Sequence, residues 1–423
     1  MEKLNYDNLG EVLYKEVLDN GLTVYYLLKP DYNRTYGLFT TNFGSLDTNF
    51  NGRAYPEGIA HFLEHKLFEK EDGDAMYKFG ALGAQTNAFT SFSRTSYLFS
   101  TRENAEACVE LLLDFVQEPY FTAENVAKEQ DIIQQEIQMY QDDSDWALFS
   151  GLLEQMYPAS ALAADIAGSP ETIQKIAVDE LYENYETFYQ PSNMNLFLTG
   201  PFDIDAMSGL VRENQAKKSF PEAKKIAVEP LLAEPARPGQ SREFELAMPK
   251  LAMGFRGEDA LPADPKERME YKLSIQLLLS LLFGKTSSFY EEHYNSGLID
   301  DSFAFAFDMD ARFHFASMTV DTEEPKKVEE LLQVQLKSYK IKDDFNEEHL
   351  SLIKKEMIGD YFQALNSLEY IANQFASELY GDVNFFDMEA ILKNLDLTTI
   401  SKHAEAFTSQ MQILDYTLYP KSK

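Results

Sequence analysis

The alternation of apolar and polar residues in the first part of the chain predicts a mixture of strands and helices. Residues 20–31 begin with an Asn20–Gly21 turn and continue as an apolar run that is typical of a strand. From Gly58 to Phe68 apolar residues recur at helical spacing, which predicts a helix. The same reasoning predicts strands at residues 36–42, 94–101 and 193–200 and helical segments at residues 103–115 and 123–156.

This pattern stops between residues 216 and 242 and then starts again. The segment is rich in proline and poor in aromatic residues, so it is expected to be a linker. Its prolines are Pro221, Pro230, Pro235 and Pro238. Beyond it the pattern predicts strands near residues 243–255, 303–307 and 313–320, a helix near 267–283, and helices after Pro325. The repeated order predicts an α+β protein with two domains of similar fold, residues 1–215 and 243–423, as in an internal duplication.

Composition and charge narrow the classes of partner. With 423 residues the chain is expected to hold more than one domain, and its formal net charge of −33 disfavours nucleic acid and anionic lipid as partners. Cys108 is the only cysteine, so no intramolecular disulfide can form. No apolar run reaches the roughly 18 residues of a membrane span, and the first residues lack an apolar signal region. We therefore expect a cytoplasmic protein.

The stretch His61-Phe62-Leu63-Glu64-His65 carries the most specific chemistry in the sequence. Residues four apart on a helix share one face, so His61 and His65 can both reach a single zinc ion. Glu64 is three residues after His61 and can hold a zinc-bound water on the same side. This order is the inverzincin pattern H-x-x-E-H. The five residues alone are equally compatible with an amphipathic helix whose two histidines lie near a core.

A catalytic zinc needs a third protein ligand and one open position for water. The best source is the helical segment that contains Glu129 and Glu136, because residues seven apart lie two turns along the same face. One carboxylate can bind the metal while the other accepts an imidazole N–H. The spacing does not decide which does which, and a solvated acidic helix face has the same pattern.

Several motifs together resemble the pitrilysin and insulin-degrading-enzyme superfamily of inverzincin metallopeptidases, in the branch of the mitochondrial processing peptidase. The matches span most of residues 20–200 and comprise Gly58–His65, Gly83–Thr90, Thr95–Tyr97, the Glu129/Glu136 pair, Gly168–Ile173 and Tyr189–Met194. The second half matches weakly, mainly through its first helix and the turn at residues 284–298.

The resemblance implies a zinc endopeptidase that binds one Zn²⁺ per chain. By this likeness His61, His65 and Glu136 are the metal ligands, Glu129 supports the site, and Glu64 is the catalytic base. It also implies two sandwich domains that together form half of a clamshell chamber. Each domain is expected to be a mixed, mostly antiparallel sheet covered by helices on one face. The family adds its substrate peptide to an edge strand, which here matches Asn87, Ala88, Phe89 and Thr90.

The second half departs from the family at two positions. Complete members carry an arginine after a Ser-Ser pair and a tyrosine shortly after a Gly-Leu pair, and both act on substrate and transition state. Here Ser287-Ser288 is followed by Phe289, and Gly297-Leu298-Ile299 by Asp300. The chain alone is thus expected to hold only the metal half of a site. We expect a heterodimer with a paralogous partner that carries the Arg/Tyr pair.

Two other functions are compatible with the sequence. Some relatives in this branch are non-catalytic structural subunits, although those tend to lose parts of the zinc motif that is intact here. A peptide-binding or export accessory factor that keeps a metal for stability is the second alternative. The remaining histidines have no partner at metal spacing and are expected at the surface or as hydrogen-bonded core residues: His293, His314, His349 and His403.

Overall fold

A computed structural model describes residues 1–237 and 239–421 of the chain. Pro238 of the expected linker and the last two residues of the expected second domain lie outside the described residues. The chain divides into two compact units, and each combines segments from both halves of the sequence. Unit 1 comprises Met1–Gln138, Ala164–Glu229 and Leu365–Glu378, and unit 2 comprises Met139–Ala163, Pro230–Ala364 and Leu379–Lys423.

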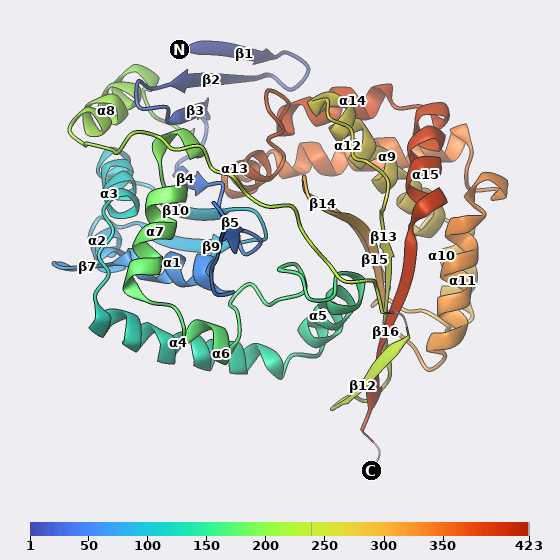
Figure 1. The fold of residues 1–423 in the computed structure, drawn as a ribbon. Coiled ribbons are helices and arrows are strands. Elements are labelled where there is room, and N and C mark those ends of the chain that lie inside the picture. Colours follow the sequence, from blue (N-terminus) through green and yellow to red (C-terminus); the bar gives the residue numbers. More distant parts are fainter. Residues whose placement is uncertain (238, 422–423) are drawn as a thin grey trace. The chain divides into compact units, whose positions relative to one another are not determined.

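Unit 1 is built on a seven-stranded mixed sheet with the order β1-β2-β3-β11-β4-β10-β9 (Figure 1). All neighbouring strands are antiparallel except β3 and β11, which are parallel. Strand β9 therefore lies at one edge of the sheet and pairs with β10. The strands are β1 (Glu2–Tyr6), β2 (Glu11–Val17), β3 (Thr23–Leu28), β4 (Thr35–Thr41), β9 (Gln85–Thr90), β10 (Thr95–Thr101) and β11 (Met194–Gly200).

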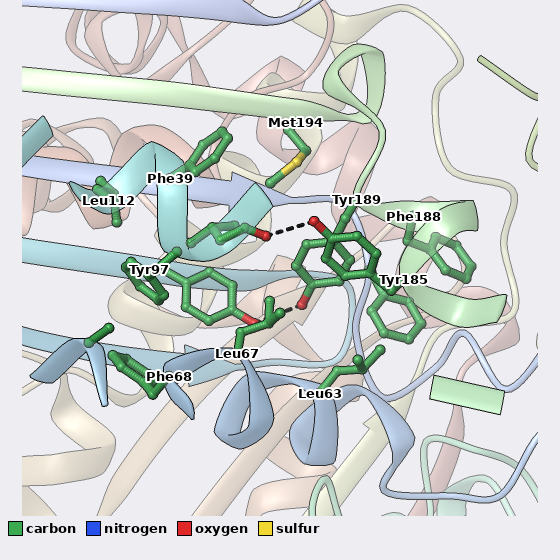
Figure 2. Close-up of a cluster of buried hydrophobic side chains, with 14 of the residues drawn as sticks. Phe39, Leu63, Leu67, Phe68, Tyr97, Leu112, Tyr185, Phe188, Tyr189 and Met194 are labelled. Carbon is green, nitrogen blue, oxygen red and sulfur yellow. Dashed lines mark hydrogen bonds between the residues drawn. The ribbon is translucent and has the colours of Figure 1, made fainter. Parts of the chain in front are cut away.

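Helices cover one face of this sheet and enclose an aromatic core. Figure 2 shows part of that core, in which Phe39 and Tyr97 of the sheet meet Leu63, Leu67 and Phe188 from helices, all of them fully buried. The helices of unit 1 are α1 (Ile59–Phe68), α2 (Ala75–Ala81), α3 (Ala105–Gln117), α6 (Pro170–Ile173), α7 (Val178–Phe188), α8 (Ile204–Ala216) and most of α4 (Ala123–Gln141). Four two-residue strands, β5 (Asn49–Phe50), β6 (Arg53–Ala54), β7 (Glu69–Lys70) and β8 (Gly73–Asp74), form two small ribbons.

The opposite face of the sheet is covered in part by a helix from the second half of the sequence. Helix α13 (Leu368–Ser377) contacts β4 and β11. Its fully buried Phe375 lies 4.7 Å, between ring centroids, from both Tyr25 and Phe197. With helices on both sides, β4 and β11 are buried along their whole length.

Unit 2 repeats the topology of unit 1 with five strands in the order β12-β16-β13-β15-β14. Its one parallel pair, β12 and β16, corresponds to β3 and β11, and the other pairs are antiparallel as in β11-β4-β10-β9. The expected duplication is thus confirmed. The strands are β12 (Gln240–Phe244), β13 (Lys250–Arg256), β14 (Ala304–Met309), β15 (His314–Asp321) and β16 (Gln412–Pro420).

Unit 2 likewise contains a helix from the other half of the sequence. Helix α5 (Ser144–Met156), from the first half of the sequence, packs on β13 and β16. The approach is close, because a Cβ on Gly254 of β13 would lie 2.5 Å from the sulfur of Met156. The other helices of this unit are α9 (Pro265–Phe283), α10 (Ser288–Asn295), α11 (Pro325–Lys337), α12 (Glu347–Ala364), α14 (Met388–Asn394) and α15 (Leu397–Gln410).

The fold class is confirmed as α+β, with two similar domains of mixed sheet and helices. Two element boundaries differ from the expectation. The helical segment expected at residues 123–156 is two helices, because Asp143 accepts hydrogen bonds from the backbone N–H groups of Asp145 and Trp146 and so begins α5. The strand expected at residues 243–255 is β12 and β13, separated by a turn. Among the described helices, none combines the length and hydropathy that crossing a bilayer requires.

Candidate metal centre

Helix α1 holds both histidines of the H-x-x-E-H stretch on one side. It begins after Gly58, whose φ of 89° and lack of a Cβ are both required, since a Cβ there would lie 2.5 Å from the carbonyl oxygen of Ala167. Apolar residues of α1 face the core of unit 1, among them Phe62, Leu63 and Leu67. His61 and His65 project from the remaining face with their ring centroids 4.5 Å apart.

Helix α4 brings two carboxylates to this face. Its residues Ile133 and Ile137 are buried in the core of unit 1, which fixes the rotation of the helix about its axis. Glu136 then lies with its carboxylate oxygens 3.8 Å from Nε2 of His61 and 3.5 Å from Nε2 of His65. Glu129, two turns earlier, accepts from the other ring nitrogen of His65, Nδ1, at 3.0 Å.

The donor atoms of His61, His65 and Glu136 fit a zinc ion. They lie within 4.8 Å of one another, and the part of the chain that the structure describes holds no other such group of three His, Cys, Asp or Glu residues. Two imidazole nitrogens and a carboxylate oxygen at bond lengths of about 2.0–2.2 Å form a common catalytic zinc donor set. The tertiary structure thus brings together the three residues that the family resemblance singled out, and places Glu129 behind His65.

The protonation of the two histidines differs. Burial lowers the pKa of His61 to about 3, with a further decrease from the nearby His65, so His61 is the neutral imidazole that a metal requires. Burial also acts to lower the pKa of His65, but the hydrogen bond with Glu129 and the charges of Glu64, Glu129 and Glu136 outweigh it, and the net shift is upward. In the metal-free site a proton therefore competes with a metal ion for His65.

Glu64 is buried beside the two histidines and is held by a hydroxyl. Its side chain is 8% exposed, and Thr90 Oγ1 donates to Glu64 Oε2 at 2.6 Å. Burial raises the pKa of Glu64, and the hydrogen bond from Thr90 opposes that increase. Glu64 is thus a buried carboxyl group with a raised pKa next to the candidate metal ligands.

Strand β9 carries the four residues expected to bind substrate. It lies at the sheet edge, and Asn87, Ala88, Phe89 and Thr90 pair with Leu98 to Thr95 of β10 on its inner side. Helix α1 contacts β9, and the two elements lie side by side in Figure 1. The side chain of Thr90 turns to Glu64, as described above.

Sequence reasoning missed Lys66, which directly follows the H-x-x-E-H stretch. Its side chain is fully buried, and its Nζ lies 3.4 Å from Oε2 of Glu129 and is bonded to Glu69. The only available signal was a lysine directly before the apolar pair Leu67-Phe68. Two of the histidines set aside are hydrogen-bonded core residues, as expected: His314 lies 2.8 Å from Asp259, and His403 lies 2.9 Å from Ser274.

A helix-borne H-x-x-E-H pair joined by a carboxylate from a second helix defines a candidate zinc centre of the inverzincin metallopeptidase class. Comparison with known proteins narrows this class. The model of the insulinase family, peptidase family M16, matches residues 44–169, and the model of the peptidase M16 inactive domain matches residues 175–357. The chain belongs to this M16 family of zinc proteases. The part that matches the inactive domain includes most of unit 2, which lacks the histidine pair.

Individual relatives agree with this assignment. The chain is 42% identical over 431 residues to the uncharacterized zinc protease YmfH of Bacillus subtilis, with 100% of both chains covered. A crystal structure described as an M16-like peptidase, from Alicyclobacillus acidocaldarius, matches with a TM-score of 0.91 at 31% identity, covering 97% of this chain and 99% of the other. The fold also matches the periplasmic protease PqqL of Escherichia coli with a TM-score of 0.72 at 18% identity, where all of this chain covers 48% of that protein.

Proposed function

We propose that this chain is the zinc-bearing subunit of an endopeptidase. The observation that carries the proposal is the convergence of His61, His65 and Glu136 from two helices, with Glu64 buried beside them. When bound there, zinc lowers the pKa of a coordinated water to about 7 and polarises a carbonyl group. Glu64 takes the proton of the attacking water and delivers it to the leaving amine. The hydrogen bond from Thr90 holds the Glu64 carboxylate in place for this transfer.

The substrate is a peptide that adds to β9 as a further strand. An edge strand has unpaired backbone N–H and C=O groups on its outer side, and an extended peptide can form ladder hydrogen bonds with them. The position of β9 at the sheet edge, in contact with α1, supports this mode. These hydrogen bonds between the peptide and β9 would place the scissile bond next to Glu64.

Full activity requires a second chain that supplies an arginine and a tyrosine. At the position expected for the arginine, Phe289 is buried in the core of unit 2, 5.2 Å between ring centroids from Phe283. It offers no charge to a substrate, and Asp300 follows the Gly297-Leu298-Ile299 stretch. A paralogous partner of similar size would complete the site.

The proposal is tested by measuring the zinc content and peptide cleavage of this chain, purified alone and together with the protein that co-purifies from the native source. We expect one zinc per chain, slow or no cleavage alone, and fast, chelator-sensitive cleavage by the complex. Full-rate cleavage by the single chain would contradict the requirement for a partner. Zinc binding without cleavage by either preparation would favour a structural or accessory subunit.

A further inference from the structure

Lys66 is a buried cation that lies next to the candidate metal centre and contacts none of its three candidate ligands through its ammonium group. Its side chain is 0% exposed, although it is one position from His65 on α1. Its Nζ forms ion pairs with Glu129 and Glu69. Glu69 is 36% exposed and is screened by water, whereas the Glu129 side chain is only 11% exposed. A buried ammonium is stable only when it is paired, so the Glu129 contact is the one that requires explanation.

The carboxylate of Glu129 is held on both of its oxygens by α1. Oε1 faces Nδ1 of His65 at 3.0 Å, and Oε2 faces Nζ of Lys66 at 3.4 Å. The terminal torsion of a glutamate is broad, so a carboxylate bonded through one oxygen can rotate away from its partner. Two donors from consecutive residues of α1 remove that freedom.

The two histidines differ in how they are supported. His65 Nδ1 has Glu129 as its partner, whereas His61 Nδ1 is buried and bonds to no group among the described residues. The orientation of the imidazole pair thus depends on the His65 side of the site. A partner on Nδ1 also fixes the tautomer that leaves Nε2 free for a metal, and Nε2 of His65 points to Glu136 at 3.5 Å.

We propose that Lys66 is a positioning residue of the metal centre, which acts through Glu129 to hold the ring and tautomer of His65 for zinc. This inference rests on the zinc site of the proposed function. The opposite role, a bare positive charge near the metal, predicts the opposite sign, because removing a nearby cation would then tighten zinc binding.

The test is the zinc dissociation constant, measured by competition with a chelator. It is measured for the full chain, for Lys66→Met, for Glu129→Gln and for the variant that carries both substitutions. Lys66→Met keeps most of the side-chain volume and removes the ammonium group, and we expect zinc to bind about 10- to 100-fold more weakly. In the Glu129→Gln background the same substitution should change the constant by less than about two-fold, because His65 and Lys66 face different oxygens of Glu129 and the amide has an acceptor oxygen at only one of these two positions. Tighter binding in Lys66→Met, or an undiminished effect in the Glu129→Gln background, would overturn the proposal.

Lys78→Met is the matched control, because Lys78, on α2 of the same unit, pairs with the exposed Asp72 and not with the metal centre. This substitution should leave zinc affinity unchanged. Circular dichroism confirms that each variant is folded. If Lys66→Met does not fold, Lys66→Gln replaces it in the same cycle with the same expected signs. Wild-type protein that binds no zinc would refute the proposed function and this inference together, whereas zinc binding without peptide cleavage would refute only the peptidase assignment.

Discussion

The hydroxyl of Thr90 donates a hydrogen bond to the carboxylate of Glu64, with 2.6 Å between Thr90 Oγ1 and Glu64 Oε2. Thr90 is the last residue of β9, and Glu64 lies in α1. The sheet edge proposed to bind substrate therefore also orients the proposed base. A substrate peptide that pairs with β9 would therefore lie close to the Glu64 carboxylate that is proposed to act on it.

Removing this hydrogen bond should slow catalysis while leaving zinc in place. Thr90→Val has nearly the same shape but no hydroxyl, and a hydrogen bond to a charged group contributes about 1.5–3 kcal/mol, so kcat should fall roughly 10- to 100-fold. Thr90→Ser keeps the donor and should retain most of the activity. Steady-state kinetics of the active complex, with zinc content measured in parallel, check this. A loss in the serine variant with no loss in the valine variant would show that the methyl group matters rather than the hydrogen bond.

Glu64→Gln should abolish most activity without loss of metal or fold. The amide cannot accept the proton of the attacking water, and loss of a general base costs about 10²–10⁴-fold in rate. Zinc content and thermal stability should match those of the wild type, because Glu64 is not among the three grouped donors. Glu71→Gln, at an exposed position seven residues later, is the control. A variant that keeps its activity would mean that another group acts as the base.

Zinc affinity should fall with decreasing pH as one proton competes with the metal. The pKa of His65 is raised in the metal-free site, so zinc must displace its proton, whereas His61, with a pKa of about 3, carries none. Below the pKa of His65 the logarithm of the dissociation constant should rise by about one per pH unit. Calorimetry in buffers of different ionisation enthalpy counts the protons released. At a pH well below 7, where a zinc-bound water keeps its protons, release of two would contradict the neutral state of His61.

The same shift determines how the stability of the metal-free protein varies with pH. Because its folded-state pKa lies above the ordinary value of 6.5, His65 contributes stability that is fully present below that value. This contribution is lost as the pH rises through the raised pKa. Denaturant unfolding gives the free energy of unfolding of the metal-free wild type and of His65→Gln, from below pH 6.5 to above the raised pKa. The difference between these two free energies should become smaller as the pH increases.

Phe375→Ala should destabilise unit 1, although Phe375 belongs to the second half of the sequence. Its ring is fully buried against Tyr25 and Phe197 of the seven-stranded sheet, and removal of such a ring costs about 3–5 kcal/mol. Denaturant unfolding followed by circular dichroism measures the loss. Phe362→Ala, at a side chain that is 40% exposed, should change stability by no more than about 0.5 kcal/mol. Similar effects of the two substitutions would argue against the packing of α13 on this sheet.

Much of the fold was predictable because its signals are local. The periodicity of residues 58–68 predicted α1, and the repeated element order predicted the duplication that the sheet orders confirm. The exchange of α5 and α13 was not predictable, because an amphipathic helix shows which face it buries but not which sheet it covers. The split at Asp143 was missed since helical spacing continues through it, and only the cap shows where α5 begins.

For the metal centre, the sequence by itself determined that His61, Glu64 and His65 share one side of a helix, because helical geometry fixes the relation between residues three and four apart. Only the tertiary structure decided where Glu129 and Glu136 lie relative to the two histidines. Both lie on one face of α4, and the packing of that helix in unit 1 brings Glu136 within 3.8 Å and 3.5 Å of the two Nε2 atoms and Glu129 to Nδ1 of His65. The same packing places Glu129 beside the buried Lys66. Lysine is usually exposed, so the sequence alone predicts a surface position for Lys66. It is stable in the interior because it is paired with Glu129, a carboxylate far away in the sequence.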